Sequence, residues 1–333
     1  MGCAVQREDL ERLEPEWRAL LPRTAANRVF VSPTWLRVWW QEFGADRELL
    51  LLSVRRQGDL VGVAPLMRDG AQTGGRLPDR LCFAGDTQVC DYMDVVAAPG
   101  EVEAVISAVL RSLGEEPWRE LVLWAVPEGS PTLDALKAAA PALGLRVDIE
   151  PEDVCPRLDL PATWDEYLAG LRKKERHELR RKLRKLSQGG EVHLEAIVHP
   201  ADVEAALDDF LRLHRSRADK AAFMTEEMER FFRVIVAALA AEAQVELLFL
   251  TLSGVRVAAV LCFCASDESL LYNSGYDPDY AYLSVGLLSK ALALRKAIEE
   301  GKQRFDFLRG PEPYKYDLGA TDRPVYRCTV RRG

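Results

Sequence analysis

Apolar positions follow helical spacing near the start of the chain and strand-like spacing soon after it. Residues 10–21 and 33–43 carry leucine and tryptophan side chains three or four positions apart, and Ser32-Pro33 is a typical helix start. Glu48–Val54 and Leu60–Met67 are apolar runs separated by a short polar turn. The pattern therefore predicts two helices followed by a β-hairpin.

The hairpin pattern recurs about 200 residues later in the chain. Glu246–Leu252 and Arg256–Val260 repeat the order of Glu48–Val54 and Leu60–Ala64. Each hairpin is followed by another strand, a helix and a last strand. We therefore predict an α/β fold built from two copies of one unit. The predicted domains are an N-terminal domain at 1–161, a basic linker helix at 162–190, and a C-terminal domain with the donor site at 191–333.

The stretch from Tyr272 to Gly310 has the clearest functional pattern. A strand is followed by a polar loop that ends in Ser284-Val285-Gly286, then by a helix with an aliphatic stripe, and then by the short strand Arg304–Leu308. A helix that begins after a small-residue loop presents unpaired amide groups and a partial positive charge, which favour a phosphate. The alternative is a plain helix cap.

The charge of the chain is strongly uneven. Leu171–Leu186 holds nine Lys or Arg residues and two Glu residues, a net charge of +7 in a chain whose total is −8, so the remainder carries −15. Like charges one turn apart destabilise a helix. We therefore expect Arg176, Arg180, Arg181 and Arg184 to meet an anion: cofactor phosphates, a phosphorylated lipid or sugar carrier, tRNA or a membrane surface.

Composition narrows the class of protein. A length of 333 residues predicts two domains, and 48% hydrophobic with 29% charged residues predicts a globular protein. No apolar run approaches the roughly 18 residues of a membrane span, and the first residues lack an apolar signal core, so we expect a cytoplasmic protein. Seven cysteines and four histidines show neither disulfide nor metal-ligand spacing. We expect no metal site.

The order of elements resembles the GNAT acyltransferase fold, in the tandem arrangement of FemABX-type members, and the motifs are most similar to the CelD-like acetyltransferase family. The matching segments span nearly the whole chain. They are Phe30–Leu36, Asp91–Asp94, Arg172–Arg184, Leu213–Arg217, Ser284–Gly286, Asp306–Gly310 and Tyr314–Gly319.

The resemblance implies two tandem GNAT-like domains with mixed sheets. It implies an acyl-CoA such as acetyl-CoA, or an acyl carrier protein, as donor, and aminoacyl-tRNA in the FemABX branch. The acceptor would be an amine or hydroxyl of a small molecule, peptide or saccharide. The pyrophosphate signature of ordinary GNAT enzymes is reduced here to Ser284-Val285-Gly286, which leaves the donor carrier undecided.

Acyl transfer needs a proton acceptor, donors for the developing oxyanion, and positioning of both substrates. We predict Asp306 as a base beside a cleft, its alternative being a buried ion pair with Arg309 or Lys315. Lys315 would supply a cation, and Tyr314 a proton for the leaving thiolate, unless this segment is a solvent-facing tail. His214 is a second candidate base or a core histidine.

The acyl-transfer hypothesis also assigns residues that would bind the donor and the acceptor. Ser284, Val285 and Gly286, with Arg176, Arg180 and Arg181, would hold the donor. Asp91, Tyr92, Asp94 and Arg309 would hold the acceptor between the domains, although Asp91 is equally suited to capping a loop.

The leading reading is an N- or O-acyltransferase. One rival is an aminoacyl-tRNA-dependent peptidyltransferase, for which the basic helix is the supporting feature. The other is a non-catalytic binding module for anionic lipid or polysaccharide machinery. The sequence does not identify the acceptor, the acyl chain length, the pathway or the oligomeric state.

Overall fold

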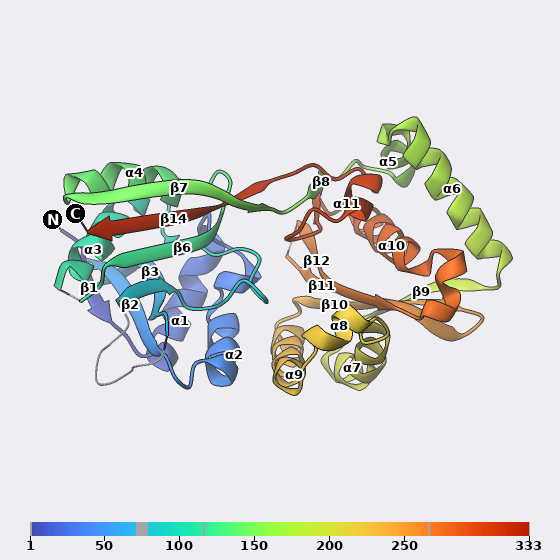
Figure 1. The fold of residues 1–333 in the computed structure, drawn as a ribbon, viewed down its shortest axis with the longest axis horizontal. Helices are drawn as coiled ribbons and strands as arrows, with labels where there is room; N and C mark the ends of the chain where they lie inside the picture. The colour runs from blue at the N-terminus through green and yellow to red at the C-terminus, as the bar shows by residue number, and fades with distance from the viewer. Residues whose placement is uncertain (1, 71–78, 116, 266, 333) are drawn as a thin grey trace. The chain divides into compact units, whose positions relative to one another are not determined.

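The computed structural model describes residues 2–70, 79–115, 117–265 and 267–332 and divides the chain into two units (Figure 1). The first unit is Met1–Asp153 with Arg323–Gly333, and the second is Val154–Asp322. The predicted domain boundary lay at residue 161 and the predicted C-terminal domain ran to residue 333. The structure instead divides the chain after Asp153 and assigns Arg323–Gly333 to the first unit.

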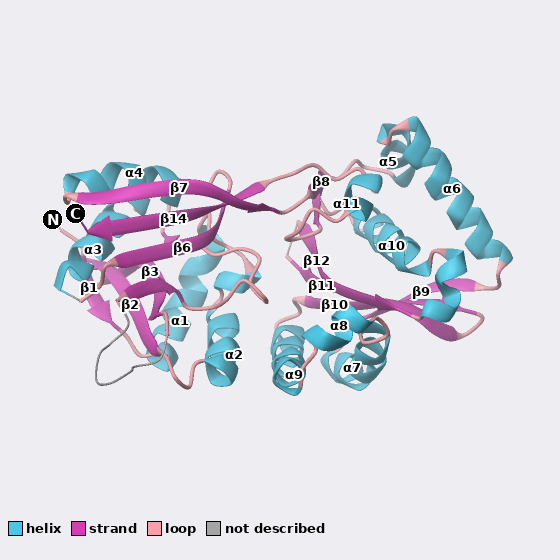
Figure 2. Ribbon diagram, viewed as in Figure 1, coloured by secondary structure: helices cyan, strands magenta, loops and turns pink. Residues whose placement is uncertain are grey.

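The first unit is a mixed sheet with helices on both faces (Figure 2). Its elements are β1 (Ala4–Arg7), α1 (Leu10–Leu20), α2 (Pro33–Phe43), β2 (Glu48–Arg56), β3 (Asp59–Arg68), β4 (Arg80–Phe83), β5 (Val96–Ala97), α3 (Val102–Ser112), β6 (Glu120–Pro127), α4 (Pro131–Ala142), β7 (Leu145–Val154) and β14 (Pro324–Arg332). The strand order is β1-β2-β3-β4-β6-β14-β7, with β5 beside β3.

The second unit repeats this plan. Its elements are β8 (Arg157–Asp159), α5 (Trp164–Gly170), α6 (Lys173–Gln188), β9 (Val192–Ile197), α7 (Pro200–His214), α8 (Ala218–Phe223), α9 (Glu226–Ala241), β10 (Val245–Leu252), β11 (Val255–Cys264), β12 (Glu268–Tyr276), η4 (Pro278–Leu283), α10 (Val285–Glu299), β13 (Arg304–Asp306) and α11 (Pro313–Asp317). The strand order is β8-β13-β12-β11-β10-β9. Helices α7 and α9 cover one face, and α10 covers the other together with α5 and α6 (Figure 1).

The two units have the same core topology, so the predicted duplication and the predicted fold class are confirmed. In the first unit β2 and β3 form an antiparallel hairpin, and β4 and β6 are parallel strands joined through α3. In the second unit β10 and β11 form the hairpin, and β12 and β13 are parallel strands joined through α10. A parallel pair needs such a crossover connection, which fixes where the helix lies.

The sheet of each unit includes a strand whose neighbours are distant in the sequence. Strand β14 lies between β6 and β7 in the first unit, and β8, at the start of the second unit, pairs with β13 near its end. The place of β14 explains why the C-terminal residues belong to the first unit. Sequence patterns report local spacing and do not reveal which distant strand becomes a neighbour.

The predicted linker helix is part of the second unit's core. It consists of two helices, α5 and α6, separated by the extended residues Leu171 and Arg172. The leucines on its inner side, Leu168, Leu171, Leu179 and Leu186, are buried against the sheet and α10. In the described part of the chain, no helix is long and apolar enough to cross a bilayer.

We expect a chain ending at Asp322 to lose stability selectively in the first unit. Val325, Cys328 and Val330 of β14 are fully buried, and each such side chain contributes about 1–3 kcal/mol on burial. Hydrogen exchange should therefore accelerate at the amides of β6 and β7, while those of β10 and β11 serve as the internal control. Unchanged protection of β6 would contradict the assignment of β14 to its sheet.

Candidate active site

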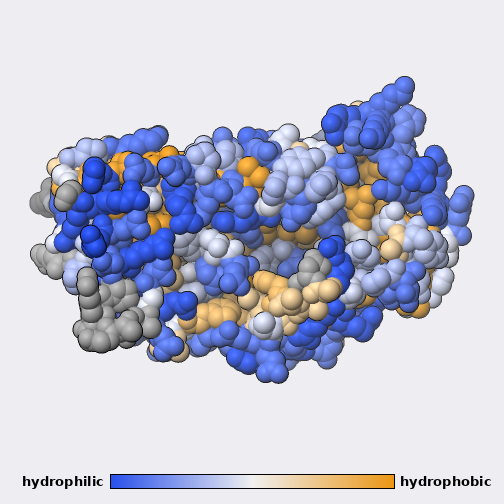
Figure 3. Space-filling view, viewed as in Figure 1, coloured by the Kyte–Doolittle hydropathy of each residue, from blue (hydrophilic) through white to orange (hydrophobic). Residues whose placement is uncertain are grey.

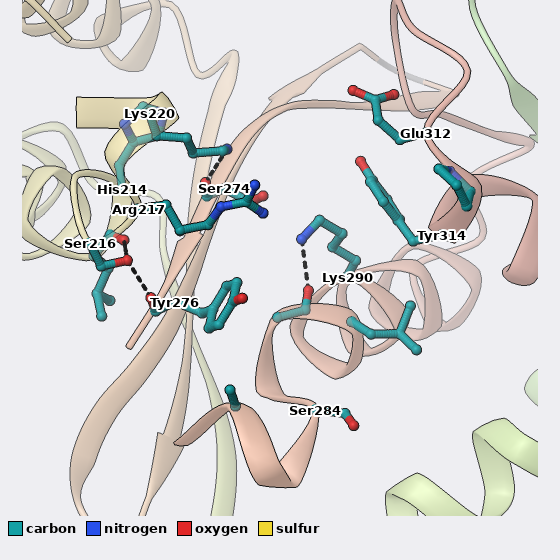
Figure 4. A pocket seen from close by; sticks show the side chains of 16 residues that line it. His214, Ser216, Arg217, Lys220, Ser274, Tyr276, Ser284, Lys290, Glu312 and Tyr314 are labelled. Carbon is teal, nitrogen blue, oxygen red and sulfur yellow. Dashed lines mark hydrogen bonds between the residues drawn. The ribbon is translucent and has the colours of Figure 1, made fainter. Parts of the chain in front are cut away.

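A pocket of about 560 Å³ lies within the second unit, where α7, β12, α10 and α11 approach one another (Figure 4). Its lining includes His214, Ser284, Gly286 and Tyr314, which the sequence had singled out separately. The structure thus brings four of the predicted site residues together, from segments up to 100 residues apart in the chain.

The pocket exists because the sheet opens between β12 and β13. These strands pair only over Glu268–Leu270, after which the chain following β13 turns toward residues 154–156: Phe307 N–H donates to the Pro156 carbonyl at 3.0 Å. Strand β12 continues to Tyr276, and no strand in the described residues pairs with its edge beyond Leu270. The pocket therefore runs along an open strand edge.

Helix α7 is held against this part of β12 at Gly275. A Cβ atom at Gly275 would lie 2.3 Å from the His214 backbone nitrogen, so only glycine permits the contact. The contact places the segment after α7 beside the open edge. Ser216 Oγ donates to the Tyr276 carbonyl at 2.5 Å, and Lys220 Nζ donates to the Ser274 carbonyl at 2.6 Å.

The N-terminus of α10 faces the pocket. Ser284, the residue before the helix, has a left-handed backbone with φ of 60°, and no side chain caps the helix. The Leu287 amide donates to the Ser284 carbonyl at 3.1 Å, which leaves the amides of Val285 and Gly286 for an anion. The Val285 side chain is fully buried, so only its backbone can contact a ligand. Gly286 is essential to the shape, since a Cβ there would lie 2.6 Å from the Tyr276 ring.

Lys290 lines the pocket and was missed by sequence reasoning. Its side chain is 8% exposed. Its Nζ donates to the Gly286 carbonyl at 2.7 Å and lies 4.9 Å from the centre of the Tyr314 ring. Burial, followed by the nearby charges of Lys220 and Arg217, lowers the pKa of Lys290 to about 7. The available signal was a lysine three residues after Leu287 and four before Leu294, on the buried side of α10.

The pocket is cationic. Among the described residues that line it, the basic side chains are Arg217, Lys220 and Lys290, and the one acidic side chain, Glu312, is paired with Lys315 at 2.8 Å. Figure 4 shows Arg217 and Lys290 directed into the space between β12 and α10, with Glu312 and Tyr314 on its far side. This charge balance and the uncapped helix both favour an anionic ligand.

His214 is a buried histidine at the edge of the pocket. Its Nε2 lies 3.0 Å from the Asn273 Oδ1 atom, which also accepts a hydrogen bond from Lys220 Nζ at 3.1 Å. Because an amide oxygen only accepts hydrogen bonds, Nε2 is the donor in this contact. The side chain packs against the rings of Phe210 and Phe223. It has features of both predicted alternatives, a core histidine and a base.

The positions of Asp306 and Lys315 do not support the predicted catalytic roles. Both are buried, and neither lines the pocket. Asp306 Oδ1 accepts a hydrogen bond from Leu308 N–H at 2.7 Å. Lys315 Nζ donates to the carbonyls of Leu308, Arg309 and Gly310 at 2.8, 2.8 and 2.9 Å. Together they hold Leu308 in a left-handed conformation with φ of 58°. These hydrogen bonds orient α11, from which Tyr314 reaches the pocket.

The predicted acceptor residues lie elsewhere. Asp94 Oδ1 and Oδ2 accept hydrogen bonds from Thr132 Oγ1 and Ser130 Oγ, each at 2.6 Å, which fixes the start of α4 in the first unit. Burial raises the pKa of Asp94. Tyr92 is buried beneath the Arg28 guanidinium at 4.3 Å. Asp91 also belongs to the first unit. Arg309 lies in the loop whose carbonyls bind Lys315 Nζ, and it does not line the pocket. None of these four residues lines the pocket, and their grouping as an acceptor site stays a prediction.

The predicted donor contacts from the basic helix are also displaced from this pocket. Arg176 Nη1 donates to the Ala169 carbonyl at 2.9 Å, which caps α5, and Arg181 pairs with Glu178 at 2.7 Å. Arg180 is exposed on α6. None of the three lines the pocket. Among the described residues, no group of three or more His, Cys, Asp and Glu side chains is arranged to hold a metal ion.

Part of the chain matches a known family. Residues 173–316 match the family model of the acetyltransferase (GNAT) domain, and they contain α7, β12, α10 and most of α11. No curated protein matches the sequence.

Solved structures share the fold at low sequence identity. The crystal structure of FemX is 14% identical, with a TM-score of 0.66 over 98% of this chain and 96% of that chain. L-PGS from Bacillus licheniformis is 14% identical, with a TM-score of 0.57 over 100% and 93%. A tandem GNAT protein from the clavulanic acid biosynthesis pathway is 14% identical, with a TM-score of 0.51 over 100% and 99%. The resemblance in these cases concerns the fold.

Replacing Lys290 should stabilise the protein. The folded-state pKa of about 7 lies below the usual value of 10.5, so protonation of the buried amine opposes folding below this range. We expect Lys290→Met to raise the free energy of unfolding at pH 7 by about 2–4 kcal/mol. The difference from the wild type should shrink as the pH rises from about 7 toward 10.5, because the wild type then gains stability. Denaturant unfolding at several pH values measures it.

Lys296→Met is the matched control on the same helix. Lys296 Nζ lies 2.5 Å from Glu246 Oε1; burial opposes its charge, but the hydrogen bonds to Glu246 and Glu300 raise its pKa. Its removal leaves Glu246 without this partner, so stability should fall. If both variants destabilise the protein at pH 7, Lys290 is not an unfavourably buried cation.

Proposed function

We propose, for a chain whose residues 173–316 form a GNAT-type acetyltransferase domain, that the protein transfers an acyl group from a thioester to an amine or hydroxyl. The thioester would be that of coenzyme A, as in acetyl-CoA, or of an acyl carrier protein. The observation that carries the proposal is the cationic pocket between the open edge of β12 and the uncapped start of α10. The donor class also favours the cytoplasm, the compartment that holds coenzyme A thioesters.

The pocket suits both parts of such a donor. The phosphates of the donor would accept hydrogen bonds from the amides of Val285 and Gly286 and face the charges of Arg217 and Lys220. The pantetheine arm contains two amides, and an extended chain with amides can pair with a strand edge that no other strand covers. At Ser274 it would replace the Asn273 and Lys220 side chains, which bond the Ser274 backbone. The arm would follow β12 toward Ser274, which brings the thioester near Lys290 and Tyr314.

The reaction then needs two proton transfers. The acceptor nitrogen or oxygen forms a bond to the thioester carbonyl carbon, the carbon–sulfur bond breaks, and sulfur leaves as a thiolate. Lys290, neutral above a pH of about 7, accepts the proton that the nucleophile loses. Tyr314, whose pKa is raised by burial and then by Glu312, keeps its proton at neutral pH and donates it to the thiolate. His214 is the alternative base, through Nδ1.

A second candidate function uses aminoacyl-tRNA as donor. The exposed positive charge of α6 favours it, as does the fold that the chain shares with FemX. An ester would then replace the thioester, and the ribose hydroxyl would be the leaving group. Such binding would fall steeply with salt concentration, because each neutralised phosphate releases counterions.

Coenzyme A should raise the melting temperature. At a concentration about 100 times its dissociation constant, a ligand adds about 2.7 kcal/mol of stability, which corresponds to about 5 °C in the second unit. Gly286→Leu should abolish the shift, because its side chain would displace the Tyr276 ring and fill the pocket. Differential scanning fluorimetry with increasing coenzyme A measures it.

Gly114→Leu is the control, since a Cβ at Gly114 meets no atom within 4 Å and the residue belongs to the first unit. A shift that survives in Gly286→Leu, or its absence from the wild type, would contradict the proposed donor site. Binding of tRNA without any response to coenzyme A would favour the second candidate.

A further inference from the structure

The outward side of α6 is a continuous cationic surface on the second unit. At 100° per residue, seven of its side chains fall within an arc of about 140°. This basic face consists of Lys173, Lys174, His177, Arg180, Arg181, Arg184 and Lys185, all of them exposed. The opposite side of the helix carries the buried Leu179 and Leu186. Figure 3 shows strongly hydrophilic surface over α6.

Little of this charge is neutralised within the chain. Arg181 pairs with Glu178 on the same helix. Lys173, Lys174, Arg180 and Arg184 have no ion pair among the described residues. Like charges three or four residues apart repel one another. The arrangement therefore opposes helix stability unless a partner with negative charge covers it.

The basic face is continuous with the segment that borders the pocket. At its C-terminal end, Lys185 Nζ donates to the Tyr282 carbonyl at 2.8 Å and lies 5.6 Å from the centre of the Tyr282 ring. Tyr282 is 64% exposed. It belongs to η4, and its neighbours Ala281 and Ser284 line the pocket. A partner on the basic face would thus lie next to the proposed entry of the donor.

The charge of the remaining chain selects the kind of partner. Outside residues 171–186 the chain carries −15. An extended polyanion, such as a nucleic acid or an anionic bilayer, would also meet this acidic surface and be repelled by it. Nucleic-acid-binding domains are basic as a whole, whereas this chain has a pI of about 5.3. A small acidic protein can contact the basic face alone.

We propose that the basic face docks a small acidic carrier protein that presents its acyl group to the pocket on a phosphopantetheine arm. The inference rests on the proposed function and specifies its donor. The carrier would meet Arg180 and Arg184 through acidic side chains, and its arm would pass Tyr282 to reach the open edge of β12. Docking and arm binding are then separate interactions, which can be tested separately.

The test uses the full chain and a fluorescently labelled acyl carrier protein in its holo form. Anisotropy should report binding that weakens as salt rises. The double variant Arg180→Glu with Arg184→Glu should weaken binding about tenfold or more. Its control, Arg12→Glu with Arg23→Glu, makes the same change in net charge at exposed positions of the first unit and should stay within about twofold of the wild type.

The melting shift with coenzyme A, measured on the same variants, separates the two proposals. A retained shift together with weakened carrier binding supports docking on α6. A retained shift with no carrier binding, or with equal weakening by both double variants, overturns the docking proposal and leaves the proposed function intact. If coenzyme A does not raise the melting temperature of the wild type, the proposed function is overturned instead. Binding of tRNA or phosphatidylglycerol vesicles through Arg180 and Arg184, without carrier binding, also overturns docking.

Discussion

The early separation of β13 from β12 is the feature on which the candidate site depends. Parallel pairing ends at Leu270, although β12 continues to Tyr276. Beyond β13 the chain bonds instead to residues 154–156, the approach to β8. Strand β8, at the start of the second unit, thus holds the diverging segment away from β12, while Asp306 and Lys315 fix its left-handed turn. No strand among the described residues pairs with this edge of β12, and side chains bond its backbone instead: Lys220 and Asn273 at Ser274, and Ser216 at Tyr276.

Several local features of the site oppose stability. Ser284 and Leu308 have left-handed backbones, at about 1–3 kcal/mol each. Lys290 is buried beside other cations, and the start of α10 is uncapped. The rest of the unit compensates through a well-packed core on both sheet faces and the glycine contact between α7 and β12. Such concentrated strain and charge at one pocket are typical of a binding or catalytic site.

Local structure was predictable from the sequence because it follows side-chain spacing. The hairpins β2–β3 and β10–β11, the helices α2 and α10, and the duplication were all visible as periodic patterns. The positions of β8 and β14 in their sheets were not predictable, because they depend on pairing between segments that are distant in the sequence. The prediction of a separate linker helix was wrong for a related reason. The spacing of the leucines in α5 and α6 shows that one side is buried, but it does not show which element covers that side.

The site was predicted in part, and the misses have a physical reason. Ser284, Gly286, His214 and Tyr314 were suggested by loop and helix patterns and do meet in one pocket. Asp306 and Lys315 have the residue types of catalytic groups, but Asp306 Oδ1 accepts from a backbone amide, and Lys315 Nζ donates to three carbonyls and pairs with Glu312. Lys290 looked like a polar interruption of an aliphatic stripe, and only the fold shows that this position faces the pocket.

A crystal structure grown with a thioether analogue of acetyl-CoA tests the central claim most directly. The account predicts phosphate density at the amides of Val285 and Gly286 and the pantetheine arm along β12 toward Ser274. Density for the analogue elsewhere on the second unit, for example in the cavity lined by Tyr167 and Tyr316, with the open edge of β12 unoccupied, would contradict it.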